Sequence, residues 1–126
     1  MSLVSVLSVA AGGAIGAASR YLVSVTMSAE GRFPWATFTV NLVGCFVAGC
    51  LISGLLARFQ ISPPVQLFLT TGLLGGFTTF SAFSVDTLRL AESGHWTLAV
   101  INALANLFGC LLAVGAGWWI ARLVIT

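Results

Sequence analysis

The chain has 126 residues, of which 59% are hydrophobic and only 6% are charged, and its formal net charge at pH 7 is +2. So few charges cannot cover the surface of a water-soluble domain, and a small, scattered net charge gives no indication of a nucleic-acid partner. The composition therefore predicts an all-α membrane protein that consists of one membrane domain. We expect four transmembrane helices, at about residues 3–25, 34–57, 63–92 and 96–124.

The first expected span has a face of small residues around Gly12 and Gly16, which are four positions apart. Such a face favours the close approach of a second helix. The only charge of this span is Arg20, about one turn inside its exit. A secretory signal peptide would have basic residues at its start, so this pattern indicates a membrane span. The Arg20 side chain either extends to the membrane interface or has a functional role.

Polar side chains interrupt the second expected span at Thr37, Thr39 and Asn41. At the rise of an α-helix, Asn41 lies roughly 10 Å deeper in the membrane than Pro34. An amide at that depth needs hydrogen-bond partners. It either ties two helices together or lines a polar route through the membrane.

The third expected span begins at Pro63–Pro64, which suits the first turn of a helix. Gly75 and Gly76 follow about 12 residues later, near the middle of a hydrocarbon core of about 30 Å. We expect the helix to break near residues 75–79. A carbonyl group freed at that depth must face protein, an ion or trapped water. The alternative is that these glycines only permit close helix packing.

Aromatic and hydroxyl side chains follow the expected break. Phe80 and Phe83 share one helical face, and Ser81 and Ser84 share the adjacent one. Two phenyl rings at this spacing often only pack against a neighbouring helix. Their position beside hydroxyl groups, directly after a break, indicates a functional role instead.

The fourth expected span carries Asn102 and Asn106 on one face. These amides either bond helix to helix or belong to a polar route. A second face has a small residue at every fourth position, which favours close packing: Ala105, Gly109, Ala113 and Gly117.

The three cysteines, Cys45, Cys50 and Cys110, lie in apolar spans without the spacing of a metal site. We interpret them as small apolar residues, and their odd number also argues against a set of disulfides.

Four spans place both termini and the connection near residue 60 on one side of the membrane. That side carries two arginines, the other side carries three, and the chain has no lysine. This bias is too weak to fix one orientation by the positive-inside rule. We therefore expect single copies to insert both ways. Two opposed copies supply the inverted symmetry that many transport proteins contain as internal repeats.

Three patterns now carry a resemblance to a known family. They are GGxxGxxxR at Gly12–Arg20, TFTVNLVG at Thr37–Gly44, and GxxGGFTTFSxFS at Gly72–Ser84. The chain resembles the Fluc (CrcB) fluoride ion channels over essentially its whole length. The resemblance implies a passive fluoride channel, and not an enzyme, in the bacterial plasma (inner) membrane. It also implies an antiparallel homodimer with two fluoride pores, in contact with lipid.

The resemblance further implies a structural sodium ion (Na+) at the dimer centre, held by the main-chain carbonyls of Gly75 and Thr78. It places Arg20 near an aqueous entrance to the pore. Where this chain has Asn102 and Asn106, the family often has a tyrosine and a serine, so the two amides depart from its pattern. The expected ion pathway comprises Arg20, Thr37, Asn41, Phe80, Ser81, Phe83, Ser84, Asn102 and Asn106.

The residues themselves indicate an anion pathway. Amide and hydroxyl groups donate hydrogen bonds, and phenyl rings present weakly positive edges. Several weak donors suit conduction, because one strong site would retain the ion. Carbonyl oxygens are hard ligands that suit a fixed cation, whose charge would favour a nearby anion. The choice of fluoride rests on the resemblance.

Two other classes of membrane protein are alternatives. A small proton-coupled exporter needs a carboxylate within the membrane, and the only candidate is Asp86, near the end of a span. A non-conducting membrane subunit would show no ion flux. An intramembrane enzyme fits poorly, because the sole histidine, His95, lies in an expected loop away from any nucleophile.

Overall fold

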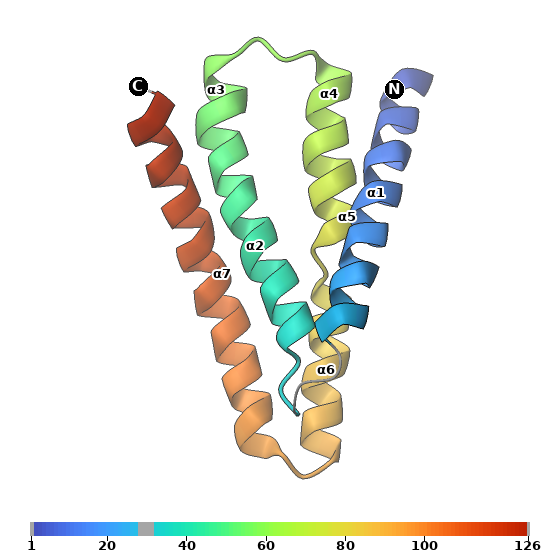
Figure 1. The fold of residues 1–126 in the computed structure, drawn as a ribbon, viewed down its shortest axis with the longest axis vertical. Coiled ribbons are helices and arrows are strands. Elements are labelled where there is room, and N and C mark those ends of the chain that lie inside the picture. The colour runs from blue at the N-terminus through green and yellow to red at the C-terminus, as the bar shows by residue number, and fades with distance from the viewer. Residues whose placement is uncertain (1, 28–31, 126) are drawn as a thin grey trace.

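The computed structural model describes residues 2–27 and 32–125, and these residues form helices and no strand. Four helical spans are long and apolar enough to cross a membrane: Leu3–Met27, Trp35–Arg58, Pro63–Glu92 and Trp96–Ile125. The prediction of an all-α membrane protein with four spans is confirmed (Figure 1).

Two of the spans are built from several helical pieces. The first span is α1 (Leu3–Met27) and the fourth is α7 (Trp96–Ile125). The second consists of α2 (Trp35–Cys50), a π-helical stretch η1 (Leu51–Leu55) and α3 (Leu56–Arg58). The third consists of α4 (Pro63–Leu67), a π-helical stretch η2 (Phe68–Leu74), α5 (Gly75–Phe77) and α6 (Phe80–Glu92).

The spans form two parallel pairs that run in opposite directions. α1 packs along α4, η2 and α5, and α2 packs along α7. The start of α1, the end of α7 and the connection between α3 and α4 lie at one end of the molecule (Figure 1). This arrangement agrees with the expected placement of the termini on one side.

Small residues bring the backbones of the first pair into direct contact. A Cβ atom on Gly16 would overlap the carbonyl oxygen of Leu73 and lie 2.8 Å from the amide nitrogen of Phe77. A Cβ atom on Gly72 would lie 2.8 Å from the carbonyl oxygen of Val9. The prediction of a close-packing face at Gly12 and Gly16 is therefore confirmed, and its partner is the π-helical stretch η2 with α5.

Two hydrogen bonds between the second span and α7 join residues that are 65 positions apart in the sequence. The Asn41 amide reaches Asn106, and the Ser53 hydroxyl reaches the carbonyl of Trp118 at 2.8 Å. Gly117 belongs to the small-residue face expected on this helix, and its Cβ atom would overlap the carbonyl oxygen of Phe46.

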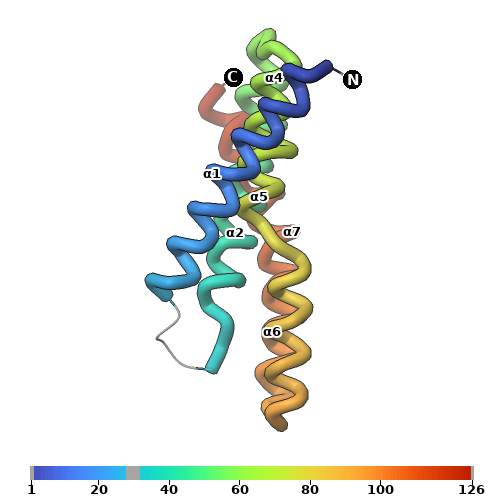
Figure 2. The backbone as a smooth tube through the Cα atoms, turned by 90° about the vertical axis from the view of Figure 1, so that its right-hand side faces the viewer, coloured from blue at the N-terminus to red at the C-terminus, as the bar shows by residue number. Residues whose placement is uncertain are grey.

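The third span is interrupted between α5 and α6, where Thr78 (φ −78°, ψ 154°) and Thr79 (φ −153°, ψ 116°) are extended. Figure 2 shows α6 displaced from the line of α4 and α5. Gly75 has helical dihedral angles (φ −64°, ψ −35°), and Gly76 is also helical. The interruption therefore lies within the expected range of residues 75–79, but beyond its two glycines. Threonine suits extended backbone, and a side chain from α2 binds the backbone here.

Candidate functional site

Asn41 of α2 holds the interrupted backbone in place. Its Oδ1 accepts a hydrogen bond from the Thr79 amide at 2.8 Å, and its Nδ2 donates to the Thr79 carbonyl at 3.1 Å. The Asn41 side chain is nearly buried, with 8% of the residue exposed. A buried amide that satisfies both polar groups of an extended residue replaces the hydrogen bonds that the helix loses there.

The interruption releases carbonyl oxygens of the preceding turn from their helical donors, among them those of Gly75 and Thr78. In an unbroken helix Thr79 N–H would donate to the Gly75 carbonyl, but it donates to Asn41. Likewise, Ala82 N–H would donate to the Thr78 carbonyl, but it donates to Thr79 Oγ1 at 3.1 Å, which caps α6. The Gly75 and Thr78 carbonyls are the two that we expected to bind a cation. The part of the chain described here has no cluster of three His, Cys, Asp or Glu side chains that would hold a metal ion.

A row of hydrogen bonds extends from the interruption toward the end of α6. Asn41 Nδ2 donates to Asn106 Oδ1 at 3.2 Å, and Asn106 Nδ2 donates to both oxygens of Asn102 at 3.0 Å. Asn102 is fully buried, and its Nδ2 donates to Thr87 Oγ1 at 2.9 Å. The structure thus brings the three predicted asparagines together and adds Thr87. The sequence indicates a role for Thr87 only by its hydroxyl group, which lies one turn beyond Phe83 on α6.

The amide groups in this row already have protein partners. Both N–H groups of the Asn41 side chain donate, as do both of Asn106. The asparagines therefore bond helix to helix, which was the alternative considered for each of them. An anion that used these donors would have to displace an existing acceptor.

A groove of about 610 Å³ opens beside the interruption. Phe80 lines this groove and is 79% exposed. The centroid of its ring lies 5.2 Å from that of Phe83, and the two rings are tilted by 56° relative to each other. Most of the lining is apolar. The lining residues are Asn41, Cys45, Ala48, Thr78, Thr79, Phe80, Phe83, Ala103, Asn106, Leu107, Cys110, Leu111 and Val114.

Ser81 and Ser84 lie outside the groove lining and are exposed on α6. The Ser84 hydroxyl donates to the Phe80 carbonyl at 2.9 Å, and the Ser81 hydroxyl lies 3.1 Å from Thr79 Oγ1. The two serines and the two phenylalanines thus occupy separate faces of α6, as their spacing predicts.

Arg20 reaches the backbone beside the interruption. Its Nε donates to the Gly76 carbonyl at 3.1 Å. This contact gives Arg20 a partner within the protein and not only at the membrane interface. Thr37 lies apart from the asparagine row, because its hydroxyl donates to Asp86 Oδ2 at 2.6 Å.

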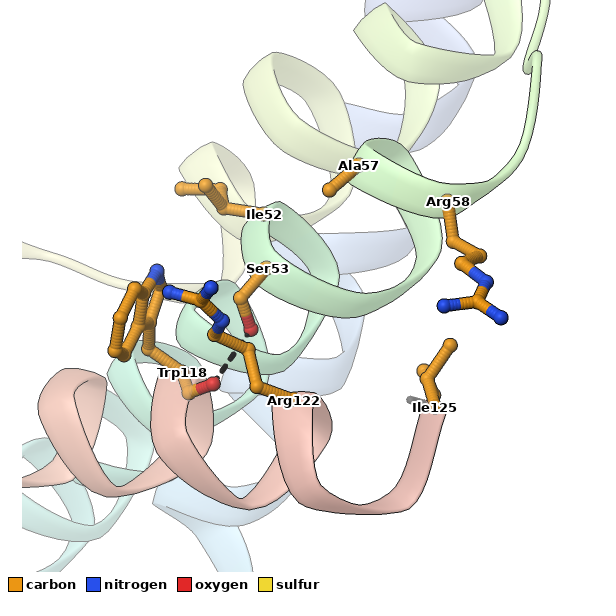
Figure 3. A pocket seen from close by; sticks show the side chains of 7 residues that line it. All are labelled: Ile52, Ser53, Ala57, Arg58, Trp118, Arg122 and Ile125. Carbon is orange, nitrogen blue, oxygen red and sulfur yellow. Dashed lines mark hydrogen bonds between the residues drawn. The ribbon is translucent and has the colours of Figure 1, made fainter.

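A second cleft, of about 300 Å³, lies between the η1 and α3 part of the second span and the last turns of α7 (Figure 3). Arg58 of α3 and Arg122 of α7 line it, and the Arg122 guanidinium lies 4.5 Å from the centroid of the Trp118 ring. None of the residues expected in the ion pathway lines this cleft. The candidate site is therefore the groove at the interruption.

Comparison with known proteins gives one consistent result. A model of the CrcB-like protein family (camphor resistance, CrcB) matches residues 7–118. The chain is 44% identical over 119 residues to the fluoride-specific ion channel FluC of Chelativorans sp. (strain BNC1), which covers 90% of this chain and 93% of that protein. It is 45% identical over 122 residues to FluC of Agrobacterium fabrum, with 95% and 98% covered. It is 40% identical over 122 residues to FluC of Geobacter sulfurreducens, again with 95% and 98% covered. Because both kinds of match extend over most of the sequence, the chain belongs to the CrcB family.

Proposed function

We propose that this protein is a fluoride-selective channel, and not an enzyme, that lets fluoride leave the cell passively across the bacterial plasma membrane. The observation that carries the proposal is the similarity over 90% or more of the chain to bacterial proteins named fluoride-specific ion channels. The four apolar spans support an integral membrane location.

The groove offers weak contacts to an anion along its length. The edges of Phe80 and Phe83 are weakly positive, and the two rings are tilted by 56° relative to each other. The Asn41 and Asn106 amides also line the groove. Contacts of this strength replace part of the hydration of fluoride and still release the ion, which conduction requires.

An antiparallel homodimer accounts for the open side of the groove. A carbonyl that faces hydrocarbon without a donor costs several kcal/mol, roughly, so the released oxygens of Gly75 and Thr78 require a cover. The groove beside them is the surface that such a cover would occupy. A second copy inserted in the opposite sense would close two such grooves and so form two pores.

The same dimer offers a site for a structural sodium ion. Two released carbonyls from each copy would supply four hard oxygen ligands around one cation. The cation would also place a fixed positive charge near the path of the anion.

Ion efflux from liposomes tests the function. Purified protein is reconstituted into liposomes loaded with fluoride or chloride, and efflux is followed with ion-selective electrodes. We expect fluoride efflux without chloride efflux, and no dependence on an imposed pH gradient. Efflux driven only by a pH gradient would indicate a proton-coupled exporter, and no efflux from correctly folded protein would indicate a non-conducting subunit.

A further inference from the structure

Cys45 of α2 and Cys110 of α7 occupy matching positions in the parallel pair. One turn before them, Asn41 and Asn106 are in contact at 3.2 Å with an offset of 65 residues. One turn after them, a Cβ atom on Gly49 would overlap the carbonyl oxygen of Val114, with the same offset. The register of the two helices therefore places the two cysteines opposite each other.

The two thiols face the same space. Both are free and half-buried, and both line the groove beside the interruption. Cys50 is also free and half-buried, but it lies outside this lining. The chain thus has one facing pair of thiols and one separate thiol.

We propose that Cys45 and Cys110 form a two-thiol binding site for a soft metal cation of low coordination number, for which Hg²⁺ is the probe. Thiol sulfur is the protein ligand that soft cations prefer. On binding, two metal–sulfur bonds form, each thiol loses its proton to water, and nothing is oxidised or reduced. The proposal does not depend on the proposed channel function.

The fold makes the pair act as a chelate. Close packing of α2 on α7 fixes both backbones, so a cation held by one sulfur meets the second at a high effective concentration. Both side chains line the groove, so a cation that reaches the groove meets both sulfurs. A single thiol such as Cys50 lacks this second ligand and must give up the metal to a competing monothiol.

Retention of Hg²⁺ against a competitor tests the site. The full chain in detergent is loaded with Hg²⁺, washed with a large excess of 2-mercaptoethanol, and assayed for bound mercury by elemental analysis. We expect wild type and the matched control Cys50→Ser to retain one Hg²⁺ per chain. Cys45→Ser and Cys110→Ser should each retain at least about tenfold less, because the chelate is lost.

Two results would overturn the proposal. One is equal retention by Cys45→Ser, Cys110→Ser and Cys50→Ser, compared only among proteins that elute like wild type. The other is a double variant, Cys45→Ser/Cys110→Ser, that retains clearly less Hg²⁺ than either single variant. If both sulfurs hold one ion, the double variant should lose no more bound Hg²⁺ than a single variant does. Losses that add would mean two independent thiols. Alanine replaces serine at any position where the serine variant does not elute like wild type.

Discussion

Asn41 makes three hydrogen bonds with one side chain, two to the backbone of Thr79 and one to Asn106. At this position an amide has an advantage that no other side chain of its size has, because it presents a donor and an acceptor together. The interrupted backbone needs both. At the scale of single residues, Asn41 is therefore the side chain on which the geometry of the groove depends most.

Asn41→Asp tests this dependence. A carboxylate keeps the acceptor for Thr79 N–H but loses both donors, and it faces the Thr79 carbonyl and Asn106 Oδ1 with a negative charge. We expect a loss of stability of about 1–3 kcal/mol or more, and little fluoride efflux from the protein that still folds. Thermal unfolding and efflux per folded chain measure the two effects. Thr39→Val on the same helix is the control and should resemble wild type, and wild-type efflux in Asn41→Asp would refute the role of this amide.

Phe80→Leu separates ion contact from packing. Because the Phe80 ring is 79% exposed within the chain, its replacement removes few contacts that stabilise the fold. A large drop in fluoride efflux with little change in unfolding temperature is expected if the ring edge contacts the ion. Phe108→Leu on α7 is the matched control, since Phe108 is also exposed but does not line the groove. Equal efflux from the two variants would show that Phe80 only packs.

Thr78→Val tests the main-chain cation site. Valine keeps the methyl group that contacts Gly44 and loses only the hydroxyl, which donates to the Leu74 carbonyl. Main-chain ligands survive this change, so the dimer of the variant should still be stabilised when Na+ replaces a large organic cation in the buffer. Size-exclusion chromatography of diluted protein measures the dimer fraction. A dimer fraction that is independent of Na+ in wild type would argue against the sodium ion itself.

At the scale of helices, two glycines differ in whether the packing leaves space for a side chain. A Cβ atom on Gly16 overlaps the backbone of Leu73, whereas a Cβ atom on Gly115 meets nothing within 4 Å. Backbone cannot yield as a flexible side chain does. The contact between α1 and the third span therefore tolerates only glycine at position 16.

The pair Gly16→Ala and Gly115→Ala turns this contrast into a prediction. The first change should destabilise the protein by about 1–3 kcal/mol because it overpacks a backbone contact. The second should cost nothing, because alanine favours a helix over glycine. Thermal unfolding of both variants in the same detergent provides the comparison. An equal effect of the two changes would contradict the close packing described for α1.

Hydropathy and helical spacing were sufficient to predict the four spans and the small-residue faces, because these properties depend on local sequence. The interruption lies at the far end of the expected range, residues 75–79, at Thr78 and Thr79 and not at the glycine pair. Glycine at 75 and 76 permits a break but does not cause one, and the extended backbone of Thr79 is bound by a side chain 38 residues earlier. The π-helical stretches and the Asn102–Thr87 bond likewise arise from contacts between spans, which one sequence does not reveal.

At the scale of the whole molecule, the distribution of arginines gives only a weak bias toward one of the two orientations in the membrane. The groove at the interruption is open in the single chain, and a second copy would close it. The connection between α6 and α7 offers a place to test the orientation, because Ser93 is exposed there. In a variant without native cysteines, Ser93→Cys should react from outside intact cells in about half of the copies, if insertion occurs both ways. The remainder should react only after the membrane is permeabilised.

A membrane-impermeant maleimide with a mass tag gives the labelled fraction on a gel. A cysteine introduced into a membrane protein of known single orientation serves as the control for intact cells. Labelling of all copies, or of none, before permeabilisation would refute dual topology and with it the antiparallel dimer.

The asparagine row also sets an order of events during biosynthesis. The partners of Asn41 come later in the chain, Thr79 by 38 residues and Asn106 by 65 residues. Because a chain is made from its N-terminus, the second span leaves the ribosome before the hydrogen-bond partners of Asn41 have been made. The third span supplies the two bonds with the Thr79 backbone, and only the fourth span supplies the bond with Asn106. A nascent chain that stops before α7 therefore lacks the acceptor on Asn106 to which Asn41 donates in the complete chain.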